Sequence, residues 1–204
     1  MVSAIDNLMA SPKGRAQVYK CFQEDTQGNI WVTTANSNNT PYKFNRFDSK
    51  QYHSFDKNGL TMLEQTYAYH EWRNAAYKGK VSETIIMHNI SGGYIGEPIK
   101  ALIDNNLLVA SVSDVSAMEK VIINYANNPD ILVNFGTLHA PGKTHHDYLN
   151  AKYDVHYRHA YTIKGFDSST NMVVISNPWH SGVDIKIPMN ELFRCTDQMT
   201  VVHL

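Results

Sequence analysis

The chain has 204 residues, enough for one sizeable hydrophobic core or for a domain with a small subdomain. Its 18 Lys and Arg nearly balance 19 Asp and Glu, which argues against a nucleic acid or an anionic membrane as partner. The two cysteines lie far apart and suggest neither a disulfide scaffold nor a zinc ribbon, and the apolar runs are too short for a membrane span.

The first half of the chain is predicted to be mainly helical. Residues 3–11 have apolar residues at helical spacing up to Ser11–Pro12. A β-hairpin is predicted for residues 16–23 and 29–36, joined by the turn signal TQGN, with room for a short strand at 42–47. The longest helical pattern and two shorter ones follow at residues 59–79, 96–105 and 113–128.

The second half has the composition of an antiparallel sheet. Its segments are short, rich in β-branched residues and bounded by turns, at residues 131–136, 158–166, 171–176, 184–188 and 199–204. The sequence therefore predicts a single α+β domain. A mainly helical lobe with a β-hairpin, residues 1–128, would face a β-sheet lobe, residues 129–204, across a cleft.

His159 and Asn177 stand at matching points of two neighbouring predicted strands. His159 opens segment 158–166, Asn177 follows segment 171–176, and antiparallel pairing would bring the two side chains level. A histidine that accepts the proton of a cysteine and an amide that orients the imidazole are two thirds of a thiol triad. Trp179 could shield their hydrogen bond from water. We therefore predict catalytic roles for His159 and Asn177 and a supporting role for Trp179.

The segments HAYTIKGF and VVISNPWHSG resemble the His and Asn-Pro-Trp segments of the calpain-type protease core, within the papain-like cysteine peptidases. Four other segments are similar to parts of the same core in the same order, at residues 20–44, 59–79, 90–103 and 187–204. The resemblance covers nearly the whole chain and depends on the order and spacing of these segments. It implies a papain-like fold.

The resemblance also implies a hydrolase that acts on protein or peptide substrates without a cofactor. In this family a cysteine at the N-terminus of the central helix attacks the scissile carbonyl, because the helix dipole lowers the thiol pKa. His159 would be the base and then the acid, and Asn177 would orient it. Ala4–Ile5 match the family residues just after that cysteine. The nucleophile and the oxyanion-hole glutamine are thus expected immediately before Met1, in a chain that is truncated, mis-started or lacks its nucleophile.

Two features depart from the family pattern. Arg158 stands where calpains usually have glycine, and we expect this cation to narrow or recharge the cleft. No acidic loops match the calcium sites of calpains. Neither cysteine fits the nucleophile: Cys21 falls in a predicted strand instead of at a helix N-terminus, and Cys195 is expected to be a small buried hydrophobic residue.

A histidine-rich segment lies between the first two predicted strands of the sheet lobe, residues 131–136 and 158–166. It contains His139, His145, His146, Asp147 and His156, whose spacing matches no established zinc pattern. We interpret it as a polar loop and predict no metal site.

Two alternative functions remain open from the sequence. A pseudoprotease would use the same cleft for binding and would have no cysteine before the first helix. A papain-fold acyltransferase or deamidase of bacterial toxin or effector type would keep the triad and differ only in the acceptor. A toxin would have an inhibitor or immunity protein as a partner. We expect a protein that is cytoplasmic or is delivered into a host or target cell, since the first residues do not resemble a signal peptide.

Overall fold

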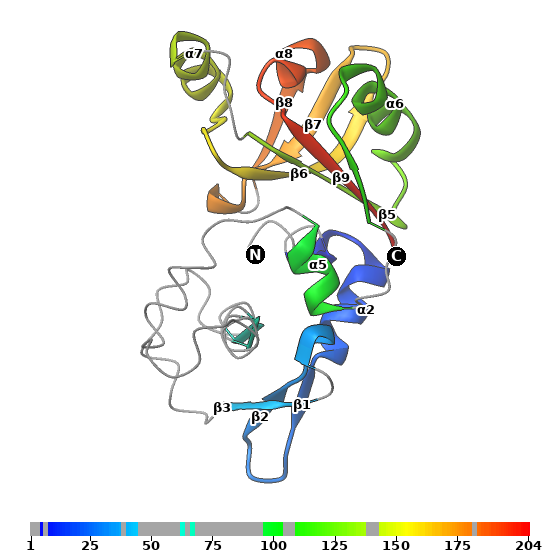
Figure 1. Ribbon diagram of the computed structural model, residues 1–204, viewed down its shortest axis with the longest axis vertical. Helices are drawn as coiled ribbons and strands as arrows, with labels where there is room; N and C mark the ends of the chain where they lie inside the picture. The colour runs from blue at the N-terminus through cyan, green and yellow to red at the C-terminus, as the bar shows by residue number, and fades with distance from the viewer. Residues whose placement is uncertain are drawn as a thin grey trace. The chain divides into compact units, whose positions relative to one another are not determined.

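The computed structural model (Figure 1) describes residues 5, 8–37, 40–44, 62–63, 66–67, 96–103, 109–137, 143–180 and 183–204. They belong to two compact units, one of residues 2–15 and 107–204 and one of residues 1 and 16–106. Helices and two antiparallel sheets confirm the α+β class. None of the helices described is long and apolar enough to cross a membrane.

The unit of residues 16–106 contains a small antiparallel sheet in the order β1-β2-β3, formed by β1 (Phe22–Glu24), β2 (Ile30–Val32) and β3 (Tyr42–Phe44). The Asp25 carboxylate stabilises the turn between β1 and β2 by accepting the backbone N–H groups of Gln27 and Asn29 at 2.9 Å. The indole N–H of Trp31 adds a third bond at 3.1 Å. These donors, those of Asn29 first, hold the pKa of Asp25 well below its usual range.

Residues 12–20 form a helix, α2 (Pro12–Lys20), so the strand prediction for residues 16–23 is wrong before Phe22. A short alternation of apolar and polar residues also fits one helical turn, and Val18 and Cys21, three positions apart, are both buried. The described part of the predicted third strand, by contrast, is confirmed by β3.

The helices predicted in the middle of the chain are confirmed where the structure describes them. α5 (Glu97–Leu102) lies within the segment predicted at 96–105, and η1 (Ala35–Ser37) contacts it. Residues 62–63 and 66–67 are helical. The remainder of segment 59–79 lies outside the described residues.

The first helical segment ends at Ser11, as the sequence predicts, and α2 begins at the next residue. Ser11 caps α2, because its hydroxyl accepts the backbone N–H of Gly14 at 2.9 Å. Pro12 is suited to the first helical position, where no backbone donor is needed. Close packing against the preceding turn explains the glycine at position 14, since a Cβ there would lie 2.1 Å from the carbonyl oxygen of Leu8.

We expect Gly14→Ala to lower the free energy of unfolding by about 1–3 kcal/mol, because the added methyl group meets backbone atoms and the chain must shift. Urea unfolding of the wild type and the variant measures this difference. Lys13→Ala is the control, since its ion pair with Asp130 is half exposed and contributes little. Equal stability of Gly14→Ala and wild type would contradict the close approach.

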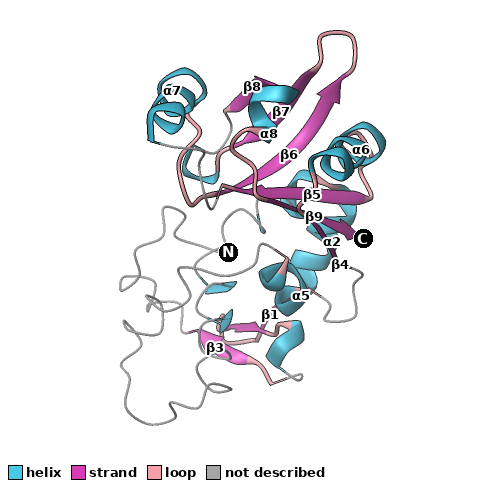
Figure 2. Ribbon diagram, turned by 45° about the horizontal axis from the view of Figure 1, so that its top comes forward, coloured by secondary structure: helices cyan, strands magenta, loops and turns pink. Residues whose placement is uncertain are grey.

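The other unit is built on a six-stranded antiparallel sheet, shown in Figure 2. The strand order is β4-β9-β5-β6-β7-β8, with β4 (Val109–Val112), β5 (Ile131–Gly136), β6 (Ala160–Asp167), β7 (Met172–Ser176), β8 (Asp184–Pro188) and β9 (Gln198–His203). Five of these strands confirm the segments predicted from the sequence. β4 was not among the predicted strands.

Three helices contribute to the core of this unit: α6 (Val115–Tyr125), α7 (Lys143–Tyr153) and α8 (Met189–Phe193). α6 confirms the helix predicted at 113–128, and the side chain of Asp114 caps it by accepting the N–H of Ala117 at 3.0 Å. Because α6 packs on β5 and β6, the boundary drawn at residue 128 falls inside this unit. The interpretation of the histidine-rich segment as a loop is wrong over residues 143–153, which form α7.

Candidate active site

The β6–β7 hairpin brings His159 and Asn177 together. His159 directly precedes β6 and Asn177 directly follows β7, and the two strands pair antiparallel. The turn is held by Asp167, whose carboxylate accepts the N–H of Ser169 at 2.9 Å. His159 Nε2 lies 3.1 Å from Asn177 Oδ1, and the Asn177 side chain is fully buried. The predicted proximity of the two side chains is therefore confirmed, although the pairing of Thr162 with Ser176 shows that His159 and Asn177 are not directly level. The catalytic role of the pair stays a prediction.

His159 is placed by the residue that follows β5. The hydroxyl of Thr137 accepts the backbone N–H of His159 at 3.0 Å and lies 2.6 Å from the carbonyl oxygen of His156. The backbone N–H of Thr137 donates to the carbonyl of His159 at 2.9 Å, and its own carbonyl accepts the N–H of Arg158. Thr137 is buried, so the chain entering β6 is tied to the end of β5 by several bonds. The sequence did not predict that Thr137 positions His159, because a single threonine after a strand forms no recognisable motif.

Aromatic rings connect His159 to the hydrophobic core. The ring of His159 meets the ring of Tyr161 edge-on, with centroids 4.8 Å apart. Tyr161 stacks in turn on Phe135, at 5.1 Å. Both Tyr161 and Phe135 are fully buried, so core packing restricts the orientation of the imidazole.

Asp154 also lies beside the His159–Asn177 pair, and the sequence did not predict it there. It follows α7 directly and has a left-handed backbone, with φ of 53°. Its Oδ2 lies 3.0 Å from Asn177 Nδ2 and 2.6 Å from His180 Nδ1, and its Oδ1 lies 2.8 Å from His156 Nε2. Partial burial, the largest influence, raises the pKa of Asp154, but the hydrogen bonds from His180, Asn177 and His156 outweigh it and lower the pKa overall. Asp154 is therefore ionised at neutral pH.

Arg158 occupies a backbone conformation that suits the glycine of the family pattern. Its φ is 50°, in the left-handed region where residues other than glycine are strained. Its guanidinium lies 5.6 Å from the ring centroid of Tyr157, and both side chains are exposed. Arg158 therefore places a cation beside His159 along the chain; its effect on substrate choice stays a prediction.

Both cysteines of the chain are buried and neither is activated. Burial raises the pKa of Cys21 to about 11 and that of Cys195 to about 12. Cys21 follows α2 and its Sγ approaches the carbonyl of Leu102, while Cys195 belongs to the core of the sheet unit, as the sequence predicts. Both thiols are therefore protonated at neutral pH.

The remaining sequence-predicted positions are described in part. Trp179 lies in η3 (Pro178–His180), but its side chain is outside the part that the structure describes, so its shielding role stays a prediction. His139 and the side chains of His145 and His146 are likewise outside it. Among the residues described, no three His, Cys, Asp or Glu side chains are placed to hold a metal ion.

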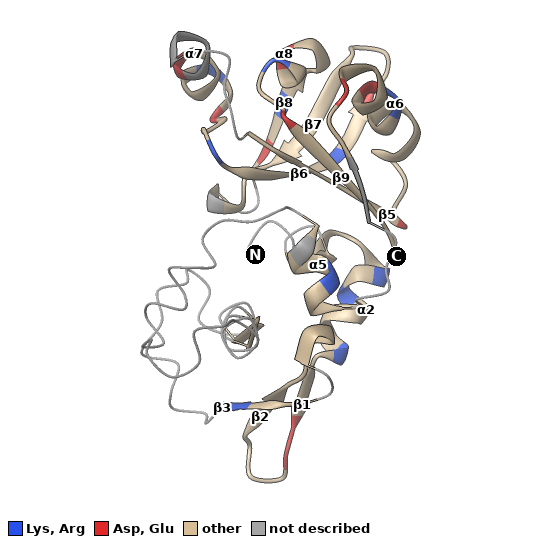
Figure 3. Cartoon of the chain, viewed as in Figure 1, with Lys and Arg blue, Asp and Glu red and all other residues tan. Residues whose placement is uncertain are grey.

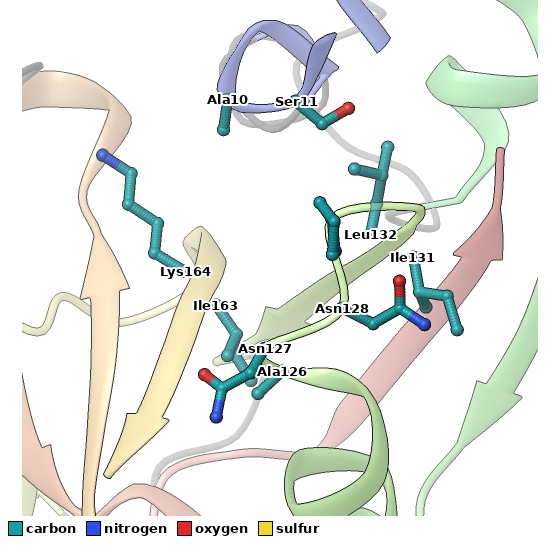
Figure 4. Close-up of a pocket in the computed structure, with 10 residues that line it drawn as sticks. Ala10, Ser11, Ala126, Asn127, Asn128, Ile131, Leu132, Ile163 and Lys164 are labelled. Atoms are coloured by element: carbon teal, nitrogen blue, oxygen red, sulfur yellow. The ribbon is translucent and has the colours of Figure 1, made fainter. Parts of the chain in front are cut away.

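A cavity of about 440 Å³ beside the turn between α6 and β5 includes neither His159 nor Asn177 (Figure 4). Its polar side chains are bonded within the protein. Asn127 exchanges two hydrogen bonds of 2.8 Å with the backbone of Phe166, and Lys164 pairs with Asp184 at 2.9 Å. Because the protein itself satisfies these groups, the cavity indicates no ligand.

Charge is mixed over the sheet unit. Figure 3 shows acidic and basic residues side by side on α6 and α7, where Glu119 adjoins Lys120 and Asp147 shares a helix with Lys152. This distribution agrees with the balanced composition, which gives no reason to expect a polyanionic partner.

Comparison of the chain with family models, curated proteins and solved structures gives no match. The calpain-type resemblance therefore depends on the sequence segments themselves.

His159 should titrate unusually low in residues 1–204. Burial, the largest influence, outweighs the hydrogen bond to Asn177 and lowers its pKa from 6.5 to about 4. The folded state thus favours the neutral ring, so this contribution to stability is complete above pH 6.5 and is lost as the pH falls through about 4. NMR titration of the histidine rings measures the pKa, and His159→Gln identifies the resonance. A pKa of 6.5 or higher would contradict the partial burial of the ring.

Proposed function

We propose that this chain is the papain-like, calpain-type core of a cysteine protease whose nucleophilic cysteine precedes Met1. The cysteine would attack the carbonyl carbon of a protein or peptide substrate after losing its proton to His159. His159 would then protonate the leaving amine, and Asn177 would hold the ring throughout. Water would release the acyl group from the sulfur, with His159 again as base.

The hydrogen bond between His159 Nε2 and Asn177 Oδ1 is the observation that supports this proposal. An amide oxygen can only accept, so Nε2 carries the proton and Nδ1 is the basic nitrogen of the neutral ring. Burial keeps this ring neutral when no thiolate is beside it. The pair thus has the protonation state that a general base requires, from two residues 18 positions apart in sequence.

A binding module on the same fold is the second candidate. It is favoured by the state of the two thiols in the chain, since Cys21 and Cys195 are both buried with raised pKa values. Without an activated thiol the chain would form no covalent intermediate, and the surface around His159 and Asn177 would only bind a protein or peptide. An acyltransferase or deamidase has no observation of its own in the structure.

The two candidates differ in their reaction with a thiol-directed electrophilic peptide. The test treats the protein with its upstream segment restored, residues 1–204 alone, and the restored protein carrying His159→Ala, and measures intact mass. We expect one adduct, only in the restored protein, on a cysteine before Met1 and formed more slowly without His159. No adduct in any form would exclude the enzyme and favour the binding module. An adduct on Cys21 would show that the N-terminal alignment is wrong.

A further inference from the structure

We infer that Asp154 is a positioning residue that fixes the amide of Asn177 and thereby determines which nitrogen of His159 is basic. The inference rests on the proposed function for its catalytic meaning. The geometry that carries it, three side-chain donors converging on one carboxylate beside the pair, belongs to the structure itself.

Asp154 fixes the orientation of the Asn177 amide. Asn177 lies between two polar groups, with one end of its amide at Asp154 and the other at His159. An ionised carboxylate can only accept hydrogen bonds, so the NH₂ group of Asn177 must face Asp154. The amide oxygen then necessarily faces His159. Turning the amide over would place oxygen against carboxylate in a site where Asn177 is fully buried, which is costly.

The orientation of the Asn177 amide in turn sets the tautomer of His159. Because the oxygen of Asn177 only accepts, the proton of the neutral ring is held on Nε2 and the lone pair is on Nδ1. Were the Asn177 amide reversed, its NH₂ group would favour a lone pair on Nε2 and a proton on Nδ1. Asp154 thus selects the basic nitrogen without touching the His159 ring.

Asp154 itself is held in place by hydrogen bonds. His156 Nε2–H and His180 Nδ1–H donate to its two oxygens, and His156 Nδ1 lies 2.8 Å from Asn150 Nδ2 on α7. A neutral imidazole has one N–H group, so His156 and His180 can each make the hydrogen bond to Asp154 in the neutral form. Asp154 was well suited to this turn, since aspartate tolerates the left-handed backbone better than most residues. The carboxylate is therefore fixed from α7, from η3 and from its own loop.

The test measures the tautomer of His159 by ¹⁵N NMR in residues 1–204. Asp154→Gly removes the carboxylate and retains the backbone, since glycine adopts a positive φ freely. We expect a single Nε2–H tautomer in the wild type and a mixture of both tautomers in Asp154→Gly. Asp154→Asn, which keeps one acceptor oxygen and the same backbone preference, should restore the Nε2–H form in part, and it carries the test if Asp154→Gly does not fold.

Asp167→Gly is the matched control. It removes another turn carboxylate with several hydrogen bonds, at the far end of β6, and should leave the tautomer of His159 unchanged. A single Nε2–H tautomer that persists in Asp154→Gly would overturn the inference, and if that variant does not fold, an undiminished Nε2–H form in Asp154→Asn would overturn it. A wild-type ring protonated on Nδ1 would overturn it as well.

Reactivity in the restored protein separates this inference from the proposed function. There Asp154→Gly should slow formation of the thiol adduct roughly tenfold, the size expected from losing one charge-assisted hydrogen bond. An unchanged rate would overturn the link between Asp154 and the base. If the restored wild type forms no adduct, the proposed function fails, and the tautomer measurement still decides whether Asp154 orients Asn177.

Discussion

Replacing His159 by alanine in the restored protein is expected to lower kcat/KM for a peptide substrate by roughly 10²–10⁴-fold, the usual contribution of a general acid and base. Under the proposed function, the thiol would lose the group that accepts its proton and later donates to the leaving amine. Asn177→Ala should reduce kcat/KM less, because the imidazole remains and only its orientation is lost. Continuous assay of peptide cleavage across pH 5 to 9 measures both variants.

The matched control for this prediction is His203→Ala. His203 is an exposed histidine at the end of β9, with its ring 5.9 Å from that of Tyr125, and its removal should leave kcat/KM unchanged. The order of the effects is diagnostic. A loss of activity in Asn177→Ala that exceeds the loss in His159→Ala would be incompatible with a base that the amide only orients.

The largest expected effect on stability is that of Phe135→Ala. Phe135 lies on β5 with no exposed surface, inside the cluster that joins the sheet to α6 and α8, and its ring stacks on Tyr161. Truncation removes buried apolar surface and leaves a cavity that a rigid sheet cannot close, so we expect the free energy of unfolding to fall by about 3–5 kcal/mol. Urea denaturation followed by circular dichroism measures the loss.

Ile123→Ala provides the comparison. Ile123 lies on α6 with about half of its surface exposed, so truncation should change the free energy of unfolding by less than about 0.5 kcal/mol. A loss below about 1 kcal/mol for Phe135→Ala would mean that β5 and β6 do not pack as described. Phe135→Leu leaves a smaller cavity than Phe135→Ala and should remain folded. In this variant the pKa of His159 can be measured without the aromatic ring that stacks on Tyr161.

The sheet could be predicted from the sequence because its strands are local patterns. Segments such as MVVIS between two turns leave little alternative to a strand, and the turn after Asp167 has the side chains that build it. β4 is different, since Val109–Val112 ends a longer apolar run that also fits a helix. Its strand conformation depends on pairing with β9, some 90 residues later. α7 was missed because its apolar pattern is weak and its helix is rich in polar residues.

The candidate site was predictable to the same extent as the sheet. A hairpin brings His159 and Asn177 near each other, so their hydrogen bond could be expected from spacing. The exact register could not, since Thr162 pairs with Ser176 and the register shifts between Ile163 and Gly165. Thr137 and Asp154 could not, because they approach the pair from the end of β5 and from the loop after α7. The contacts of Thr137 and Asp154 depend on the paths of the loops after β5 and α7. These paths leave no periodic pattern in the sequence.

The place of β9 in the sheet bears on how the protein acquires its structure during synthesis. β5 to β8 follow one another along the chain and pair as neighbours, so each of these strands can pair with the preceding one as soon as it has been translated. β9 is translated after all of them, yet it lies between β4 and β5. Until it emerges, β4 has no sheet to join, and the edge of β5, from whose end Thr137 reaches His159, stays unpaired. Vectorial folding thus leaves β4 and one edge of β5 unpaired until β9 has been translated, and this slow, long-range pairing follows the local pairing of β5 to β8.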